Sequence, residues 1–207
     1  PAKHEHYAAI TEPAKVGELL RAIDAFQGSF PVQCALRLAP LLFVRPGELR
    51  KATWDGFDLD KGEWTYLATK TNTNHLVPLA SQAVAILRDL HKLTGHRQHV
   101  FPGGQDPRKP MSEAAVNAAL RRMGYDKTEM TAHGFRALAS SLLNAQNWEA
   151  DVIERQLAHA ERSKTRAAYH RHQYVSERRR MMQAWADYLD GLAKGAYVVP
   201  IGAARTA

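Results

Sequence analysis

The sequence has 207 residues, of which 45% are hydrophobic, enough for one domain with a substantial core. Lysine and arginine total 28 against 21 aspartates and glutamates, and the net charge of +7 favours a polyanionic partner, either nucleic acid or an anionic surface. The single cysteine excludes an internal disulfide and suits a reducing cytoplasm, and the most apolar run, residues 30–44, is too short to span a membrane and contains Arg37.

The first part of the sequence predicts helices followed by a small sheet. Apolar residues at helical spacing predict an amphipathic helix over about 13–27, and an almost wholly apolar segment predicts a central, buried helix over about 31–43. A short helix is expected to begin at Pro46. Three strand candidates with hairpin-like turns between them come next, at 54–59, 63–69 and 75–80.

The remainder of the sequence is predicted to be helical. Amphipathic segments are found at 81–93, 111–123, 133–146, 149–159, 163–174 and 176–194. The expected fold is therefore mainly α with a small three-stranded antiparallel sheet, an α+β architecture. We expect one domain over residues 1–195 and an extended or disordered tail over 196–207.

An arginine stands at the end of the most apolar segment. Guanidinium is always charged and is costly to bury without a partner, so Arg45 needs a reason to be there. We expect it to end the buried helix, with its stem packed and its planar fork aimed at a phosphate. Glu48, one helical turn further on, is placed to hold a guanidinium by hydrogen bonds.

Other residues whose side chains could take part in catalysis follow at intervals along the chain. Lys70 stands at the end of the second predicted strand, and His133 and Arg136 are three positions apart on a predicted helix, hence on one face. His159 and Tyr169 come ten residues apart near the end of the sequence. Each signal alone is weak, because a His-x-x-Arg pair usually belongs to a polar surface and a lone tyrosine usually belongs to a core.

Taken together and in order, these segments are specific. The series VRPGELR, TKTNTNHLVPL, HGFRALASSLLN, LAH and AAY resembles the tyrosine site-specific recombinases, and most closely the integrases of prophages and pathogenicity islands. The resemblance extends from about Ala8 to Leu192 and implies the recombinase catalytic-domain fold for residues 1–195. It also implies that the family's N-terminal DNA-binding domains are absent from this chain.

The resemblance implies six catalytic residues, with Glu48 in support: Arg45, Lys70, His133, Arg136, His159 and Tyr169. The tyrosine would form a covalent 3′-phosphotyrosyl link, and the lysine would protonate the departing 5′ oxygen. The two guanidinium forks suit the non-bridging phosphate oxygens, and the histidines suit hydrogen bonding to the phosphate and proton relay. Because arginine needs no metal to carry positive charge, we expect no metal ion and no other cofactor.

The implied function is site-specific recombination, the integration or excision of a prophage or genomic island. The implied partners are double-stranded DNA attachment sites, three further copies of the chain in a homotetramer on DNA, and an excisionase or host DNA-bending protein. The chain would be monomeric without DNA and would work in the cytoplasm of a bacterial host, with no membrane partner. Two alternatives stay open: a type IB topoisomerase-like enzyme that relaxes a single duplex, and a catalytically silent DNA-binding module.

Two further expectations concern the C-terminal part. Tyr174 lies fifteen residues after His159 and just before a helix start, where an aromatic is usually a packing residue, so Tyr169 is the better nucleophile. A helical apolar stripe then runs through Met181, Met182, Trp185 and Leu189, which packs within this chain or, as the resemblance allows, on a neighbouring protomer. Basic segments at 45–51, 119–127 and 161–172 are expected to follow the DNA backbone, although each could instead be a solvated helix face.

Overall fold

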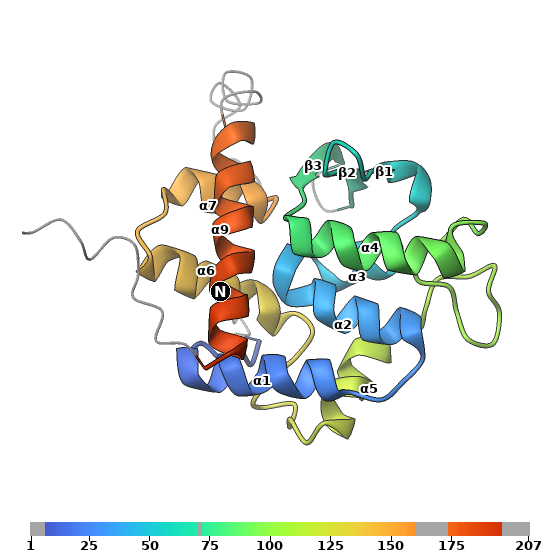
Figure 1. Cartoon of the computed structure of the whole chain (residues 1–207), viewed down its shortest axis with the longest axis horizontal. Helices are drawn as coiled ribbons and strands as arrows, with labels where there is room; N and C mark the ends of the chain where they lie inside the picture. The colour runs from blue at the N-terminus through green and yellow to red at the C-terminus, as the bar shows by residue number, and fades with distance from the viewer. Residues whose placement is uncertain (1–6, 70–71, 160–173, 196–207) are drawn as a thin grey trace, which may run out of the picture.

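The computed structural model describes residues 7–69, 72–159 and 174–195 and confirms a mainly helical fold with one three-stranded antiparallel sheet (Figure 1). The expected helix over 163–174 and the tail over 196–207 lie outside the described residues, apart from Tyr174. The helices and strands, with one short 3₁₀ helix η1, are α1 Pro13–Ala25, α2 Phe30–Leu42, α3 Pro46–Arg50, η1 Trp54–Gly56, β1 Phe57–Asp58, β2 Glu63–Ala68, β3 Thr73–Pro78, α4 Ser81–Thr94, α5 Ala115–Arg122, α6 Gly134–Ala145, α7 Ala150–Gln156 and α9 Val175–Ala193.

Helix α2 is the centre of the fold, as its apolar sequence predicts. It contacts α1, α4, α5, α6 and α9, so nearly every face of it is covered (Figure 1). Pro40 lies inside the helix, and its carbonyl oxygen accepts a hydrogen bond of 2.9 Å from the indole Nε1 of Trp185 in α9. Because α2 leads directly into α3, the position of this buried helix determines where Arg45 lies.

The sheet has the order β1-β2-β3 and lies beside α3 and α4 (Figure 1). Trp64 pairs with Val77 across β2 and β3, and both side chains are buried. The first strand is much shorter than expected from residues 54–59. Residues Trp54–Gly56 form a 3₁₀ turn instead, because the indole of Trp54 is tied to the end of α4 through a hydrogen bond of 3.0 Å to the carbonyl of Thr94.

The helix expected over 111–123 is also shorter than the pattern suggests. Met111 is held in an extended segment by a hydrogen bond of 2.7 Å from its amide to the carbonyl of Phe101, and α5 begins only at Ala115. The backbone pairing of this loop therefore takes precedence over the local helical preference. None of the helices in the described part of the chain is long and apolar enough to cross a membrane.

The apolar stripe of α9 packs within this chain. Met181, Met182, Trp185 and Leu189 are buried in the common core, and the C-terminal end of α9 crosses and packs on α1 (Figure 1). The two helices approach so closely that a Cβ atom on Gly17 of α1 would lie 2.5 Å from the carbonyl oxygen of Leu192. In this structure the stripe is covered by its own domain.

Candidate active site

Arg45 begins a helix rather than ending one. Helix α2 stops at Leu42 because Phe43 takes a left-handed backbone conformation, with φ of 39°. Pro46 then opens α3 and restricts the residue before it to extended backbone, so Arg45 is the residue that caps the N-terminus of α3. The expectation that Arg45 ends the buried helix is therefore wrong, because Arg45 belongs to the start of the next helix. The side chain of Arg45 is nevertheless largely buried, with 17% exposed.

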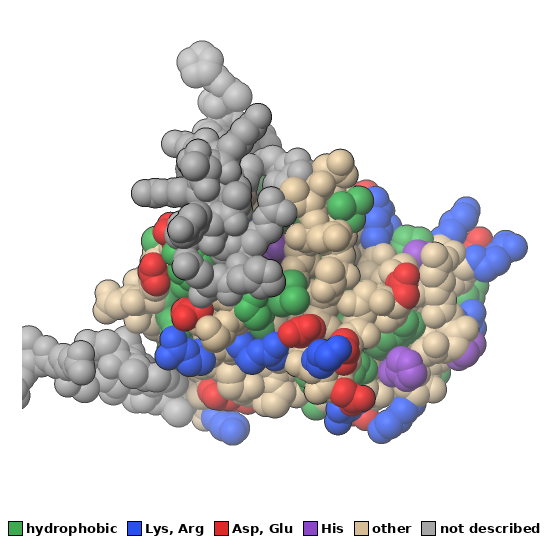
Figure 2. All heavy atoms as spheres, turned by 90° about the horizontal axis from the view of Figure 1, so that it is seen from above, with side chains coloured by type: hydrophobic (Ala, Val, Ile, Leu, Met, Phe, Trp, Pro, Cys, Tyr) green, Lys and Arg blue, Asp and Glu red, His purple; other side chains and the backbone are tan. Residues whose placement is uncertain are grey.

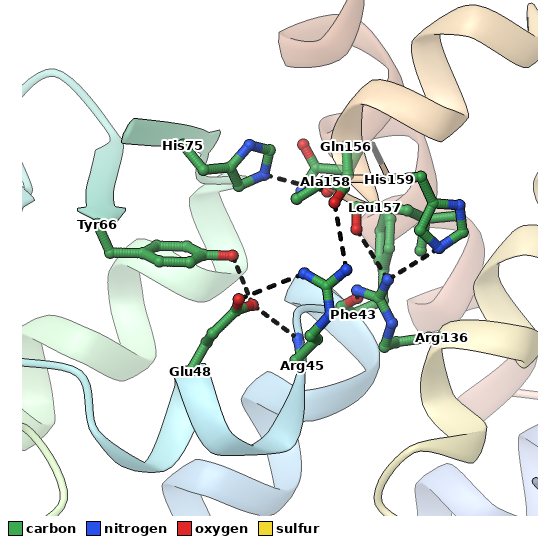
Figure 3. Close-up of polar contacts among 10 residues, drawn as sticks. All are labelled: Phe43, Arg45, Glu48, Tyr66, His75, Arg136, Gln156, Leu157, Ala158 and His159. Atoms are coloured by element: carbon green, nitrogen blue, oxygen red, sulfur yellow. Dashed lines mark hydrogen bonds and ion pairs between the residues drawn. The ribbon is translucent and has the colours of Figure 1, made fainter. Parts of the chain in front are cut away.

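Glu48 holds Arg45, as expected (Figure 3). Its Oε1 lies 3.3 Å from the guanidinium Nη1 of Arg45, and its Oε2 accepts a hydrogen bond of 3.2 Å from the backbone amide of the same residue. The hydroxyl of Tyr66 in β2 donates a third hydrogen bond, of 2.8 Å, to Oε2. Burial and the charge of Glu48 raise the pKa of Tyr66, so the hydroxyl remains a donor and the buried carboxylate is fully satisfied.

Arg136 is buried behind Arg45, with 5% of the residue exposed. Its Nη1 donates a hydrogen bond of 3.0 Å to the carbonyl of Phe43, and its Nη2 donates one of 2.8 Å to the carbonyl of Leu157 (Figure 3). Burial, and then the nearby positive charge of Arg45, lower the pKa of Arg136 to about 10, so it is still charged at neutral pH. Two guanidinium groups thus converge at one place although α6 and α3 are far apart in the sequence.

Strained backbone supplies part of this support. Ala158 has a positive φ of 49°, and its carbonyl accepts a hydrogen bond of 3.2 Å from Nη2 of Arg45. Phe43, whose carbonyl is bonded to Arg136, also has a positive φ. Left-handed backbone is unfavourable for residues with a side chain and is retained where surrounding structure requires it. At both positions it turns a carbonyl oxygen toward a guanidinium.

His159 joins the two arginines in the site. Its Nε2 lies 3.2 Å from Nη2 of Arg136 (Figure 3), and its Nδ1 lies 2.6 Å from Oε2 of Glu154. A guanidinium can only donate, so Nε2 accepts and Nδ1 carries the proton of the neutral ring. The expected grouping of Arg45, Arg136 and His159 is therefore present in the structure.

His133 lies at the N-terminus of α6, one turn before Arg136. It is the residue before α6 rather than a member of its first turn, because the helix begins at Gly134. Its carbonyl accepts a hydrogen bond of 3.1 Å from the amide of Arg136, and its ring packs against that of Tyr7, with 4.0 Å between the ring centroids. The backbone of His133 is itself helical, with φ of −74° and ψ of −27°, so His133 and Arg136 keep the one-turn spacing that the sequence predicts.

Two of the expected catalytic residues, Lys70 and Tyr169, lie outside the described residues. The rival tyrosine, Tyr174, is described. It is half-buried, packs against the hydrophobic core and immediately precedes α9. That position agrees with a packing role for Tyr174, and the choice of Tyr169 as nucleophile stays a prediction.

A buried polar network lies next to the site. His75 of β3 donates from Nε2 to the carbonyl of Gln156, 3.2 Å away (Figure 3). Gln156 also accepts hydrogen bonds of 3.1 and 2.7 Å from Arg178 of α9, which donates in addition to the carbonyl of Leu76. Burial, followed by the charge of Arg178, lowers the pKa of His75 to about 3, so this imidazole is neutral. The network fastens the end of α7, directly before the turn that carries His159, to the sheet and to α9.

Of the three basic segments expected to follow DNA, 161–172 lies outside the described residues, and 119–127 makes contacts within the fold. On the face seen in Figure 2, Lys and Arg side chains are interspersed with Asp and Glu. In the segment 119–127, Arg121 donates to the carbonyl of Met130, and Arg122 donates to the carbonyl of Gln27. These guanidinium groups stabilise the fold, which agrees with the more modest interpretation of that segment.

Sequence patterns did not reveal several residues that shape the site. Tyr66 is one of three Phe, Trp and Tyr residues in the strands, so nothing in the sequence singles it out. Glu154 belongs to no motif, although its place five residues before His159 puts it within reach across the end of α7. The carbonyl acceptors leave no signal in side-chain identity at all. Within residues 7–69, 72–159 and 174–195, no group of three or more His, Cys, Asp or Glu is placed to hold a metal ion.

Comparison with known proteins places these features in a family. Residues 10–175 match the model of the phage integrase family. The chain is 43% identical over 205 residues to the integrase of Enterobacteria phage P4, covering 91% of this chain and 46% of that protein. The chain thus spans about half the length of the relative that it matches.

Solved structures share the fold. The integrase from mycobacterium phage Brujita superimposes with a TM-score of 0.65 at 17% identity, over 93% of this chain and 65% of that one. The lambda integrase tetramer bound to a Holliday junction gives a TM-score of 0.56 at 16% identity, over 80% of this chain and 49% of that one. With the family model covering most of its length, the chain belongs to the phage integrase family of tyrosine recombinases.

Proposed function

We propose that this chain is the catalytic domain of a site-specific DNA recombinase that integrates or excises a prophage or genomic island in the cytoplasm of a bacterial host. The observation that carries the proposal is the convergence of Arg45, Arg136 and His159, held by Glu48, Glu154 and backbone carbonyls. Two always-charged forks beside an imidazole form a receptor for a phosphodiester.

The proposed chemistry follows from that receptor. The hydroxyl oxygen of Tyr169 attacks the phosphorus and gives up its proton to His133. The bond to the 5′ oxygen breaks, and Lys70 supplies the proton that the leaving oxygen takes up. Negative charge that develops on the non-bridging oxygens is offset by Arg45 and Arg136. The 3′-phosphotyrosyl link keeps the energy of the broken bond, so a 5′ hydroxyl of another strand can reverse the step and complete the exchange.

The proposed partners are double-stranded attachment sites, with four protomers assembled on DNA. The fold shared with the lambda integrase tetramer bound to a Holliday junction supports this assembly. An excisionase or a host DNA-bending protein is a further proposed partner. Relaxation of a single duplex, as by a type IB topoisomerase, would use the same chemistry but needs no partner protomer.

Covalent trapping tests the proposal. The chain is incubated in excess EDTA with a nicked suicide duplex, from which the cleaved strand's short 5′ fragment diffuses away. We expect a covalent protein–DNA adduct that Tyr169→Phe abolishes and Tyr174→Phe retains, with DNA binding intact in both variants. A strict requirement for magnesium, or an adduct that survives Tyr169→Phe and disappears in Tyr174→Phe, would refute the assigned chemistry.

A further inference from the structure

We infer that Glu154 is a positioning residue for His159, and that its carboxylate sets which ring nitrogen faces the phosphate. This inference rests on the proposed function. It concerns a contact that leads outward from the imidazole, whereas the contact with Arg136 leads inward. Nδ1 of His159 and Oε2 of Glu154 are 2.6 Å apart, a short distance typical of hydrogen bonds to a charged acceptor.

The two contacts of the ring determine its tautomer. Arg136 offers only donors, so its approach to within 3.2 Å requires a lone pair on Nε2 of His159. Glu154 offers only acceptors when ionised, so its contact requires the proton on Nδ1. The carboxylate and the guanidinium thus select the same tautomer from opposite edges of the ring, and the ring plane is fixed between them.

Entry of a phosphate changes what the ring must do. Phosphate oxygens accept hydrogen bonds, so Nη2 of Arg136 can turn from the ring to the phosphate, but Nε2 of His159 can then bind an oxygen only if it carries a proton. The ring that serves the phosphate is therefore doubly protonated, with Nδ1–H still donated to Glu154. A carboxylate on Nδ1 stabilises that imidazolium, and its loss leaves the charged ring without a counter-charge at that edge.

The charges around the ring make this contribution necessary. Arg136 of α6 and Arg45 at the start of α3 both bring positive charge to the site, and both oppose a charged imidazole. Glu154 comes from α7, which ends at Gln156, three residues before His159, so both partners are carried by one short piece of chain. Its negative charge also acts on Arg136, where it favours the charged guanidinium. About half of each side chain is exposed, 46% for His159 and 53% for Glu154, so solvent moderates the attraction while the geometry still fixes the ring.

The tautomer provides a test that does not need DNA. The full chain is labelled with ¹⁵N-histidine, and the His159 signals are assigned by their loss in His159→Gln. At alkaline pH, where the ring is neutral, we expect the unprotonated nitrogen to be Nε2 in the wild type and a mixture of tautomers in Glu154→Ala. Asp151→Asn removes one charge from the same exposed side of α7 and should leave the wild-type pattern. Identical tautomer populations in wild type and Glu154→Ala would overturn the inference.

A double-mutant cycle tests the mechanistic part. Single-turnover cleavage of the suicide duplex should slow by about tenfold in Glu154→Ala, as for other residues that orient a functional histidine. The same substitution in a His159→Ala background should have no further effect, because the carboxylate acts through the ring. Equal slowing in both backgrounds would show a separate structural role and overturn the inference. A wild-type chain that forms no adduct while its tautomer still depends on Glu154 would refute the proposed function but leave the positioning contact in place.

Discussion

Arg45 and Arg136 donate hydrogen bonds to the carbonyl oxygens of two consecutive residues, Ala158 and Leu157. One turn of backbone therefore sets the separation of both guanidinium groups. The residue after this turn is His159, whose ring contacts Arg136. A shift of this turn would move both guanidinium groups and the imidazole together, so the site is built around the end of α7 rather than around any one side chain.

We expect that lysine cannot replace either arginine. Arg136→Lys keeps the charge but loses the fork that reaches Phe43, Leu157 and His159 at once, so we expect single-turnover cleavage to fall by about two to three orders of magnitude. Arg45→Lys should impair cleavage to a similar degree. Because Arg136 is the more deeply buried, its replacement should also lower the free energy of unfolding, by about 1–3 kcal/mol.

The matched control for these variants is Arg108→Lys. Arg108 is exposed and paired with Asp106 in a surface loop, so its replacement should change neither cleavage nor stability. Trapping assays and urea unfolding on the three variants give both readouts. Wild-type cleavage by Arg45→Lys and Arg136→Lys would show that these residues do not bind the phosphate.

Glycine should be more favourable at position 158 than the alanine that is present there. The φ of 49° at Ala158 disfavours any residue with a Cβ, whereas glycine adopts this conformation without steric strain. We expect Ala158→Gly to raise the free energy of unfolding by up to about 1 kcal/mol, with the carbonyl still available to Arg45. Ala184→Gly, in the middle of α9, is the control of opposite sign and should destabilise by about 1 kcal/mol. Equal destabilisation by both substitutions, measured by urea unfolding, would contradict strain at Ala158.

The sequence predicts the parts of this fold that depend on local patterns. Apolar periodicity locates α1, α2 and α9, and alternation with turn residues locates β2 and β3. The order of segments such as VRPGELR and HGFR identifies Arg45, Arg136 and His159, and the structure brings them together. Glu48 is predictable as well, because a carboxylate three positions after an arginine lies one helical turn away.

Long-range backbone contacts account for what the sequence does not predict. The shortened first strand follows from the bond between Trp54 and Thr94, and the late start of α5 follows from the pairing of Met111 with Phe101. The left-handed conformation of Ala158 is equally hidden, because alanine has no preference for it. These features arise where segments that are distant in the sequence come into contact, and a local sequence pattern carries no information about such contacts.

Tyr66 is expected to stabilise the position of Arg45 through Glu48. Tyr66→Phe removes one of three donors to a buried carboxylate, so the free energy of unfolding should fall by about 1.5–3 kcal/mol. Cleavage should fall less than in Arg45→Lys, because the guanidinium itself remains. Tyr125→Phe is the control, since Tyr125 is only half-buried and its replacement should change stability by less than about 0.5 kcal/mol. Equal stability losses in the two variants, compared by urea unfolding, would rule out a special contact at Tyr66.

His75 should make the stability of the domain depend on pH. Burial, and then the charge of Arg178, lower the pKa of His75 to about 3, whereas a histidine in the unfolded chain has a pKa of about 6.5. As the pH falls below the pKa of His75 in the unfolded chain, the unfolded chain binds a proton that the folded chain does not bind. The free energy of unfolding therefore decreases between about pH 6.5 and about pH 3. The loss from this one group should reach about 1.4 kcal/mol per pH unit.

His75→Gln isolates that contribution. Glutamine can still donate to the carbonyl of Gln156 but does not titrate, so its stability should fall less steeply than that of the wild type from pH 7 to pH 4. Urea unfolding at a series of pH values measures the two slopes. His96→Gln serves as the control, because His96 is exposed and its loss should leave the wild-type slope unchanged. If the free energy of unfolding changed with pH equally steeply in wild type and His75→Gln, His75 would bind a proton as readily in the folded state as in the unfolded one. The polar network next to the site would then not depend on a neutral imidazole.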